Sequence, residues 1–246
     1  MTEKTTIKRQ IFRRPGVMIE WGLSLLELFF PRICASCSKS LFLHERVICT
    51  PCRLHLPETG YHADPDNKVA AIFWGRVWFE HCSSFLIYRK GNSVQKLVHQ
   101  LKYKGRQEIG EYLGGLYGKK LAASGVLSDI DGIVPVPLHK KKERIRGYNQ
   151  SLSIANGLAA ELSKPVWKNV VIRSTFNESQ TKKDRFSRWE NAKDRFLLSE
   201  GNDISGKHIL LVDDVITTGS TIEALATAFG SADNVKLSVV SIGSAY

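Results

Sequence analysis

The chain has 246 residues, enough for one large domain or for a medium domain with a small appendage. Hydrophobic residues make up 43% and charged residues 24%, which excludes a disordered chain and predicts a buried core. The formal net charge of +11 at pH 7 favours an anionic partner, such as a phosphorylated metabolite or a nucleic acid. A basic surface that only keeps the protein soluble is the alternative.

Residues 1–16 are polar and basic without a periodic pattern, and we expect a frayed terminus there. Apolar residues recur at helical spacing over residues 17–30, which predicts an amphipathic helix that packs on the protein itself or docks on a partner. Residues 18–30 are too few to cross a membrane, which takes about 20 residues, and they include Glu20 and Glu27. No small-residue cleavage site follows, so we expect a cytoplasmic protein without a membrane span.

Four of the five cysteines form two Cys-x-x-Cys pairs. Two such pairs bring four thiolates to one point, which is typical of a structural zinc site. The odd number of cysteines and the missing export signal argue against a disulfide framework, and a redox pair is the alternative to zinc. We expect Cys82, outside the pattern, to be a buried thiol. The predicted zinc ligands are Cys34, Cys37, Cys49 and Cys52.

Beyond the cysteines, strand-like runs alternate with helical patterns. We divide the chain into a helix and zinc module (17–56), a linker rich in turn-forming residues (57–67) and a large domain (68–246). The alternation predicts an α/β fold with a mainly parallel sheet flanked by helices, preceded by a small N-terminal zinc-binding module. The expected strands are 82–88, 132–136, 166–173, 208–212 and 235–242, and the expected helices lie near 93–102, 108–123, 149–162 and 221–229.

The most specific segment is residues 208–229. Its fully apolar part, residues 209–212, predicts a central parallel strand, and Asp213 and Asp214 stand at the carboxyl end, where open α/β sheets bind ligands. A hydroxyl-rich turn then leads into a helix, whose first amides and hydroxyls suit a phosphate monoester. Carboxylates accept hydrogen bonds from ribose hydroxyls, so the segment predicts a ribose 5-phosphate site. The turn consists of Thr217, Thr218, Gly219, Ser220 and Thr221.

Other phosphate-binding motifs fit this segment less well. A nucleoside triphosphatase loop needs a lysine in G-x-x-x-x-G-K-[ST], and a dinucleotide fold needs G-x-G-x-x-G after its first strand. A capped helix without function explains the Thr and Ser residues but not the two acids.

The run LLVDDVITTGST resembles the signature of type I phosphoribosyltransferases, which bind 5-phosphoribosyl-1-pyrophosphate (PRPP). The resemblance implies that Asp213 and Asp214 hold the ribose hydroxyls and that residues 217–221 bind the 5-phosphate. It also implies magnesium that is carried by PRPP and has few protein ligands.

A second anion site is needed for the pyrophosphate of PRPP. Residues 134–149 follow a short apolar strand and are strongly basic, and we expect Lys140, Arg144 and Arg146 to bind the pyrophosphate. A solvated basic loop is the alternative.

The run RGYNQS at residues 146–151, together with Gln180, Thr181, residues 185–191 and the cysteine module, resembles the ComF family of competence proteins. The resemblance extends from about Leu25 to the carboxyl terminus. It implies a zinc finger joined to a phosphoribosyltransferase-like domain. It also implies a role in natural transformation on cytoplasmic single-stranded DNA, alongside a helicase-like partner.

Residues 174–196 interleave basic and aromatic side chains. The resemblance implies a hood loop over the substrate that contains Gln180, Thr181 and Arg185, and Arg185 joins the acidic pair as a candidate catalytic residue. The same composition suits stacking and charge neutralisation of single-stranded nucleic acid, and an ordinary amphipathic helix is the third interpretation.

Three functions remain open. The first is a ComF-like protein that binds PRPP and acts on DNA, which is an enzyme if it transfers the phosphoribosyl group. The second is a metabolic phosphoribosyltransferase that joins ribose 5-phosphate to a nucleobase. The third is a non-catalytic nucleic-acid-binding module on the same fold.

Overall fold

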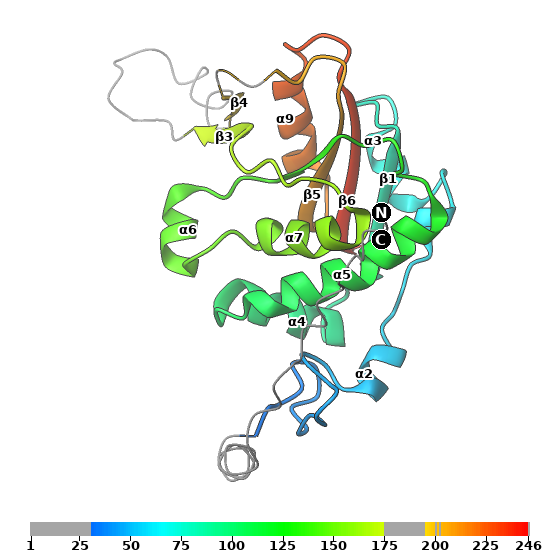
Figure 1. The fold of residues 1–246 in the computed structure, drawn as a ribbon, viewed down its shortest axis with the longest axis vertical. Helices are drawn as coiled ribbons and strands as arrows, with labels where there is room; N and C mark the ends of the chain where they lie inside the picture. The colour runs from blue at the N-terminus through cyan, green and yellow to red at the C-terminus, as the bar shows by residue number, and fades with distance from the viewer. Residues whose placement is uncertain (1–30, 175–194, 200, 202, 246) are drawn as a thin grey trace, which may run out of the picture.

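The computed structural model describes residues 31–174, 195–199, 201 and 203–245 (Figure 1). Strands and helices alternate along most of this part of the chain, which confirms the predicted α/β class. In chain order, the first elements are α2 (Thr50–Leu54), the 3-10 helix η1 (Tyr61–Ala63), α3 (Lys68–Phe73), β1 (His81–Ile87), α4 (Ser93–Tyr103) and α5 (Gln107–Ser124). They are followed by β2 (Gly132–Pro135), α6 (Lys140–Arg146), α7 (Gln150–Leu162), β3 (Val171–Ser174), β4 (Arg195–Leu198), β5 (His208–Ile216), α9 (Ser220–Phe229) and β6 (Lys236–Ser244).

The main sheet has four strands in the order β1-β6-β5-β2, and all three neighbouring pairs are parallel. Strand β5 lies inside the sheet, where Ile209 through Val212 are completely buried, as expected for a parallel strand covered on both faces. The strand extends to Ile216 instead of ending at residue 212 as predicted. The two aspartates therefore belong to the strand itself, at the edge where the parallel strands end.

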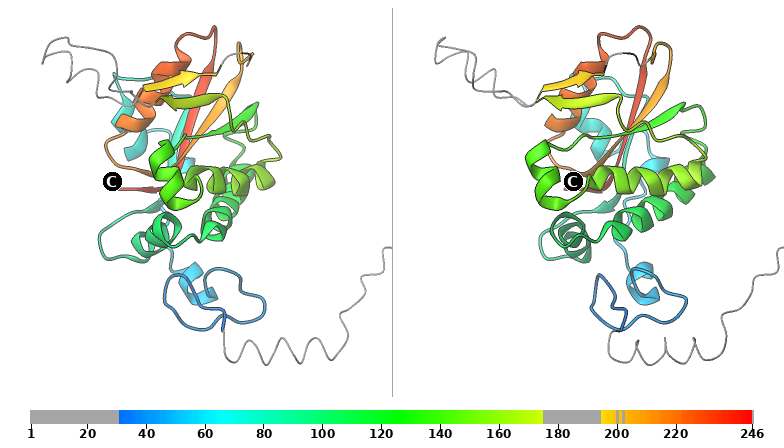
Figure 2. Two further views of the ribbon diagram at one scale, coloured as in Figure 1. Left: turned by 90° about the vertical axis from the view of Figure 1, so that its left-hand side faces the viewer. Right: turned by 60° about the vertical axis from the view of Figure 1, so that its left-hand side comes forward.

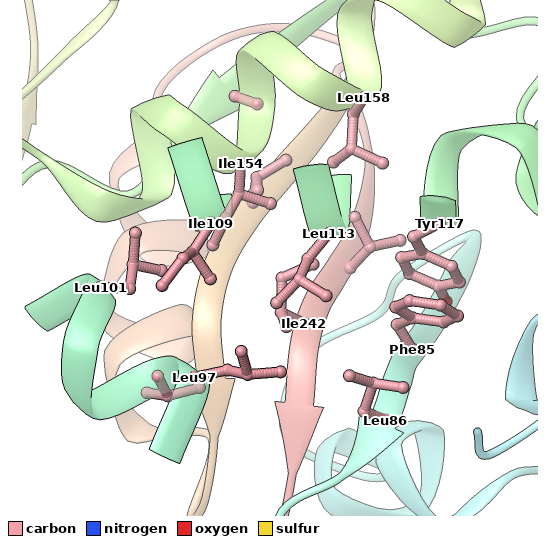
Figure 3. Close-up of a cluster of buried hydrophobic side chains, with 14 of the residues drawn as sticks. Phe85, Leu86, Leu97, Leu101, Ile109, Leu113, Tyr117, Ile154, Leu158 and Ile242 are labelled. Atoms are coloured by element: carbon pink, nitrogen blue, oxygen red, sulfur yellow. The ribbon is translucent and has the colours of Figure 1, made fainter. Parts of the chain in front are cut away.

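Helices cover both faces of the sheet, and the side chains of β5 alternate between them. Leu210 and Val212 lie in a hydrophobic cluster with α4, α5 and α7, whereas Ile209 and Leu211 lie in a second cluster with α3 and α9. Figure 3 shows the first cluster, with side chains from these three helices meeting the sheet. Its labelled helix residues are Leu97, Leu101, Ile109, Leu113, Tyr117, Ile154 and Leu158.

Helices α5 and α7 approach each other so closely that glycine is required on both. A Cβ atom on Gly114 would lie 2.3 Å from the carbonyl oxygen of Ile154, and one on Gly157 would lie 2.2 Å from that of Glu111. At the start of α7, the Asn149 side chain accepts a hydrogen bond from the amide of Ser151 (3.0 Å) and donates one to the carbonyl of Val136 after β2 (3.0 Å). The first turn of α7 is thereby fixed at the carboxyl edge of the sheet.

Two further segments differ from the prediction. The expected strand at 166–173 is divided: Val166 forms a bridge to Ile133 beside β2, and from Val171 the chain forms β3, which pairs antiparallel with β4 outside the main sheet. The basic run before Gly147 forms helix α6 instead of a loop, because the His139 ring caps its amino end and Gly147 ends it with a φ of 80°. A prediction from charge alone missed the helix.

The cysteine module, residues 31–56, lies at one end of the molecule beside α4 (Figures 1 and 2). Its buried residues Cys34, Ala35 and Ile48 belong to the same hydrophobic cluster as α4 and α5. Gln100 of α4 donates a hydrogen bond to the carbonyl of Ala35. The module therefore packs directly on the α4 side of the large domain.

Residues 57–67 run along β1, where the Thr59 amide donates to the Phe85 carbonyl (3.0 Å) and the Ile87 amide donates to Pro57 (2.8 Å). The helix predicted at 17–30 lies outside the described residues. Within the described ranges, none of the helices has the length and apolar character that crossing a membrane requires.

Candidate functional site

The acidic pair lies at the carboxyl end of β5, and groups from two helices hold it. Ser151, in the first turn of α7, donates its hydroxyl to Asp213 Oδ1 (3.2 Å), which also accepts the backbone amide of Asp214 (2.8 Å). Lys102, near the end of α4, forms an ion pair with Asp214, with Nζ 2.8 Å from Oδ1. Both carboxylates are partly buried, so each stays within reach of a ligand.

Burial and the neighbouring charge affect the protonation of Asp213. Desolvation, with the adjacent Asp214 carboxylate as the second cause, raises the pKa of Asp213 to about 7. The Asp214 amide, Lys102 and the Ser151 hydroxyl act in the opposite direction but do not cancel the effect. The two carboxylates at the end of β5 therefore have different surroundings. A strongly shifted pKa such as that of Asp213 is common in binding and catalytic sites.

The hydroxyl-rich turn that the sequence predicts as an anion site follows at the end of β5. Gly219 adopts a φ of 76°, which disfavours any residue with a Cβ atom. Such an atom would also lie 2.8 Å from side-chain atoms of both Ile72 and Phe73 of α3, so both the backbone conformation and the packing favour glycine. Helix α9 begins at the next residue, and the side chain of Thr218 accepts its first amide (3.5 Å), while its cap residue Gly219 provides no side-chain acceptor for the amides that follow. A small depression is lined by Asp213 and residues 215–222.

The hydroxyls of the turn are accessible. Thr217, Thr218 and Ser220 are exposed, and the Thr218 and Ser220 hydroxyls lie 3.1 Å apart. Arg76, just after α3, supports the turn, because it donates to the Thr218 carbonyl (3.5 Å) and forms an ion pair with Glu223 of α9. The turn thus presents exposed hydroxyls to a ligand, while Arg76 fixes its backbone.

The three residues predicted to bind the pyrophosphate differ in burial and in their contacts. Lys140 and Arg144 are exposed on α6, and in the described part of the chain no hydrogen bond or ion pair joins them to the acidic pair. Arg146 is partly buried, donates to the Gln150 side chain (2.8 Å) and lies over the Tyr103 ring at 5.3 Å. The predicted hood residues Gln180, Thr181 and Arg185 lie outside the described residues.

Lys102 and Ser151 belong to the site but were not predicted from the sequence. Lys102 was one of many basic residues between 90 and 106, and nothing in its local pattern separates it from its neighbours. Ser151 falls within the RGYNQS run but has no chemical signal of its own. Only the tertiary fold brings both to the end of β5.

The four predicted zinc ligands lie together, and their sulfur atoms are all within 4.8 Å of one another. Backbone amides of Ser36 and Cys49 donate to the Cys34 sulfur at 3.4 and 3.3 Å. Burial alone would raise the pKa of Cys34, but hydrogen bonds from backbone groups of Cys37, Cys49 and Ser36 lower it to about 7. Such a cluster is suited to a metal that binds thiolates.

The environments around the cluster and around the fifth cysteine differ. Glu45 accepts the amides of Phe42 (2.9 Å) and Thr50 (2.5 Å), which ties the loop between the two Cys-x-x-Cys pairs to the second pair. Cys82 on β1 is 7% exposed and burial raises its pKa to about 12, which confirms the predicted buried thiol.

The raised pKa of Asp213 predicts a pH-dependent gain in stability for Asp213→Asn. Between the ordinary carboxyl pKa of about 4 and about 7, folded wild type keeps a proton that the unfolded chain has lost, so its free energy of unfolding falls as pH rises through this window and stays low above it. Asparagine keeps an accepting oxygen for Ser151 but carries no charge. We expect the variant to gain on the order of 1–2 kcal/mol at about pH 8 and clearly less at about pH 5, measured by chemical denaturation. The exposed Asp66→Asn is the control, and an equal effect at both pH values would contradict the raised pKa.

Comparisons with known proteins agree with this architecture. The family model described as phosphoribosyl transferase domain matches residues 149–243. DNA utilization protein YhgH of Escherichia coli K12 is 32% identical over 222 residues, which are 87% of this chain and 86% of that protein. Competence protein ComFC of Bacillus subtilis is 29% identical over 76% of this chain and 80% of its own length, and Competence protein F of Haemophilus influenzae is 26% identical over 80% and 90%. The chain belongs to the ComF family and contains a phosphoribosyltransferase-like domain.

Proposed function

We propose that the carboxyl edge of the sheet binds PRPP and that the protein acts on cytoplasmic single-stranded DNA during DNA uptake. One observation carries the first part: two carboxylates, a hydroxyl-rich turn and a helix amino end follow one another directly along β5 and α9. Carboxylates accept the ribose hydroxyls, and the turn and helix amides donate to the 5-phosphate. Both halves of a ribose 5-phosphate thus find matching groups in adjacent positions.

The pyrophosphate is assigned to cations at the same edge. Arg146 is the best supported of the three predicted residues, since its contacts with Gln150 and Tyr103 hold it near the start of α7. Lys140 and Arg144 contribute charge from the exposed face of α6. Magnesium would be held mainly by oxygens of the ligand, with Asp213 and Asp214 as the carboxylates at hand, and would neutralise the pyrophosphate charge.

Phosphoribosyl transfer breaks the bond between the anomeric carbon and the pyrophosphate oxygen, and an acceptor nucleophile forms the new bond. The positive charge that develops on the sugar would be favoured by the nearby carboxylates, and positioning of the two reactants would supply much of the rate. Arg185 of the predicted hood is the further candidate catalytic residue.

The role in DNA handling is supported by the names of the relatives, which are competence and DNA utilization proteins. The net charge of +11 and the exposed basic helix α6 fit a nucleic-acid partner. A helicase-like protein is the further proposed partner. A metabolic phosphoribosyltransferase for a nucleobase is the rival function, and turnover of PRPP with a defined base would establish it.

Calorimetric titration of PRPP with magnesium tests the ribose phosphate site. We expect micromolar binding to wild type and at least about 100-fold weaker binding to the double variant Asp213→Ala, Asp214→Ala, because each ribose hydroxyl loses a charged acceptor worth about 1.5–3 kcal/mol. The variant removes two negative charges, so a purely electrostatic site would bind the anion more tightly instead.

The matched control is Asp64→Ala, Asp66→Ala, which removes two exposed carboxylates elsewhere and should bind like wild type. Equal affinity in both double variants, or no binding to the folded wild type, would leave a nucleic-acid-binding module as the better account.

The cysteine cluster is proposed to hold one structural zinc ion. Cys37 is the exposed member of the four, so Cys37→Ser changes the packing least while it removes a ligand. We expect about one equivalent of zinc in wild type, loss of zinc and unfolding of the cysteine module in Cys37→Ser, and partial retention of PRPP binding. Cys82→Ala should keep its zinc. Less than about half an equivalent in freshly purified wild type, measured by elemental analysis, would refute the zinc site.

A further inference from the structure

A groove lies along the line where the cysteine module packs on helix α4, outside the ribose phosphate site. It has a volume of about 660 Å³, and its walls come from the first Cys-x-x-Cys turn, the end of β1 and one face of α4. The opposite face of α4, with Val94, Leu97 and Leu101, is completely buried, so the groove face is the one left for a ligand. The lining residues that matter below are Cys37, Tyr88, Lys96, His99, Lys102 and Tyr103.

Aromatic and cationic side chains alternate on this face of α4. The Tyr103 ring is 61% exposed and lies one helical turn from His99, with ring centroids 5.0 Å apart. Lys96 and Lys102 flank these rings along the same helix. Exposed rings offer a surface on which a flat base can stack, and lysines neutralise phosphate, which together are the features of sites for single-stranded nucleic acid.

Two contacts connect the groove to the ribose phosphate site. Lys102 lines the groove, and its ammonium group forms the ion pair with Asp214. Tyr103 lies under the guanidinium of Arg146, which donates to Gln150 in the first turn of α7. The groove therefore shares Lys102 with the surroundings of the acidic pair and borders the ribose phosphate site.

We propose that this groove binds a nucleotide unit as the acceptor side of the site, with the base stacked on Tyr103, the tilted His99 ring beside it and the phosphate at Lys96. The role of this nucleotide as acceptor of the phosphoribosyl group rests on the proposed function, whereas binding of the nucleotide in the groove does not. A free mononucleotide and a unit within a single strand share this chemistry. Lys102 stands between the two ligands, since it contacts Asp214 on one side and the groove on the other.

Fluorescence anisotropy of a labelled oligothymidylate of about six nucleotides tests the groove on the full-length, zinc-loaded chain. We expect Tyr103→Leu, which keeps apolar volume but removes the ring, to bind about 10-fold more weakly, and Lys96→Gln about 3-fold more weakly. Two controls remove the same groups elsewhere: Trp78→Leu at an 83% exposed ring and Lys119→Gln at a 67% exposed side chain. Both should bind within about 2-fold of wild type.

Competition separates the two sources of the ligand. Displacement of the probe by thymidine 5′-monophosphate assigns the groove to free nucleotides, and displacement only by unlabelled oligothymidylate assigns it to single strands. The proposal fails if wild type binds neither, if the controls weaken binding as much as Tyr103→Leu, or if only a variant of α6 such as Lys141→Gln weakens it.

Calorimetry of PRPP with the same variants keeps this proposal apart from the previous one. Lys96→Gln should retain wild-type affinity for PRPP while it binds the oligonucleotide about 3-fold more weakly, because within the described ranges Lys96 contacts none of the residues assigned to PRPP. Absence of PRPP binding in all proteins, with oligonucleotide binding that depends on Tyr103, would overturn the proposed function and leave the nucleotide groove in place.

Discussion

The arrangement of this protein depends on holding two adjacent carboxylates at the end of a buried parallel strand. Two negative charges so close together, in a partly desolvated place, are unfavourable, as the raised pKa of Asp213 indicates. The fold offsets this with groups from two helices: Ser151 of α7 on Asp213 and Lys102 of α4 on Asp214. The helices that pack on this face of the sheet are thus also the ones that complete the site.

The same dependence extends to the cysteine module. The module contacts the large domain through α4, where Gln100 donates to the Ala35 carbonyl and the buried residues of both parts form one cluster. Helix α4 therefore has the cysteine cluster at one side and Asp214 at the other. A metal that orders the cysteine turns would also fix one wall of the nucleotide groove, which gives a physical reason for joining the two parts in one chain.

The parts of the site that follow one another in sequence could be predicted from it. The apolar run of β5, the two acids and the hydroxyl-rich turn are contiguous, and each has a chemical reason that can be read locally. The Cys-x-x-Cys spacing likewise predicted a cluster that the structure brings together. The α/β class followed from alternating patterns, since these depend on local periodicity.

The remaining features depend on tertiary contacts that no local pattern reports. Lys102 reaches Asp214 only because α4 packs across the carboxyl edge of the sheet, and Tyr103 becomes part of a site only because Arg146 lies over it. The run from Lys140 was interpreted as a loop because it is almost entirely charged and shows no apolar periodicity. It forms a helix whose ends are set by His139 and Gly147. The strand expected near Val166 is reduced to a bridge with Ile133, because the chain then leaves the main sheet and pairs as β3 with β4.

A crystal structure of the full-length protein with bound ribose 5-phosphate tests the central claim most directly. The account predicts the phosphate in the turn of residues 217–221, the ribose hydroxyls on Asp213 and Asp214, and the Lys102 ammonium displaced from Asp214. A phosphate bound at α6 instead, with the Lys102–Asp214 ion pair intact, would contradict it.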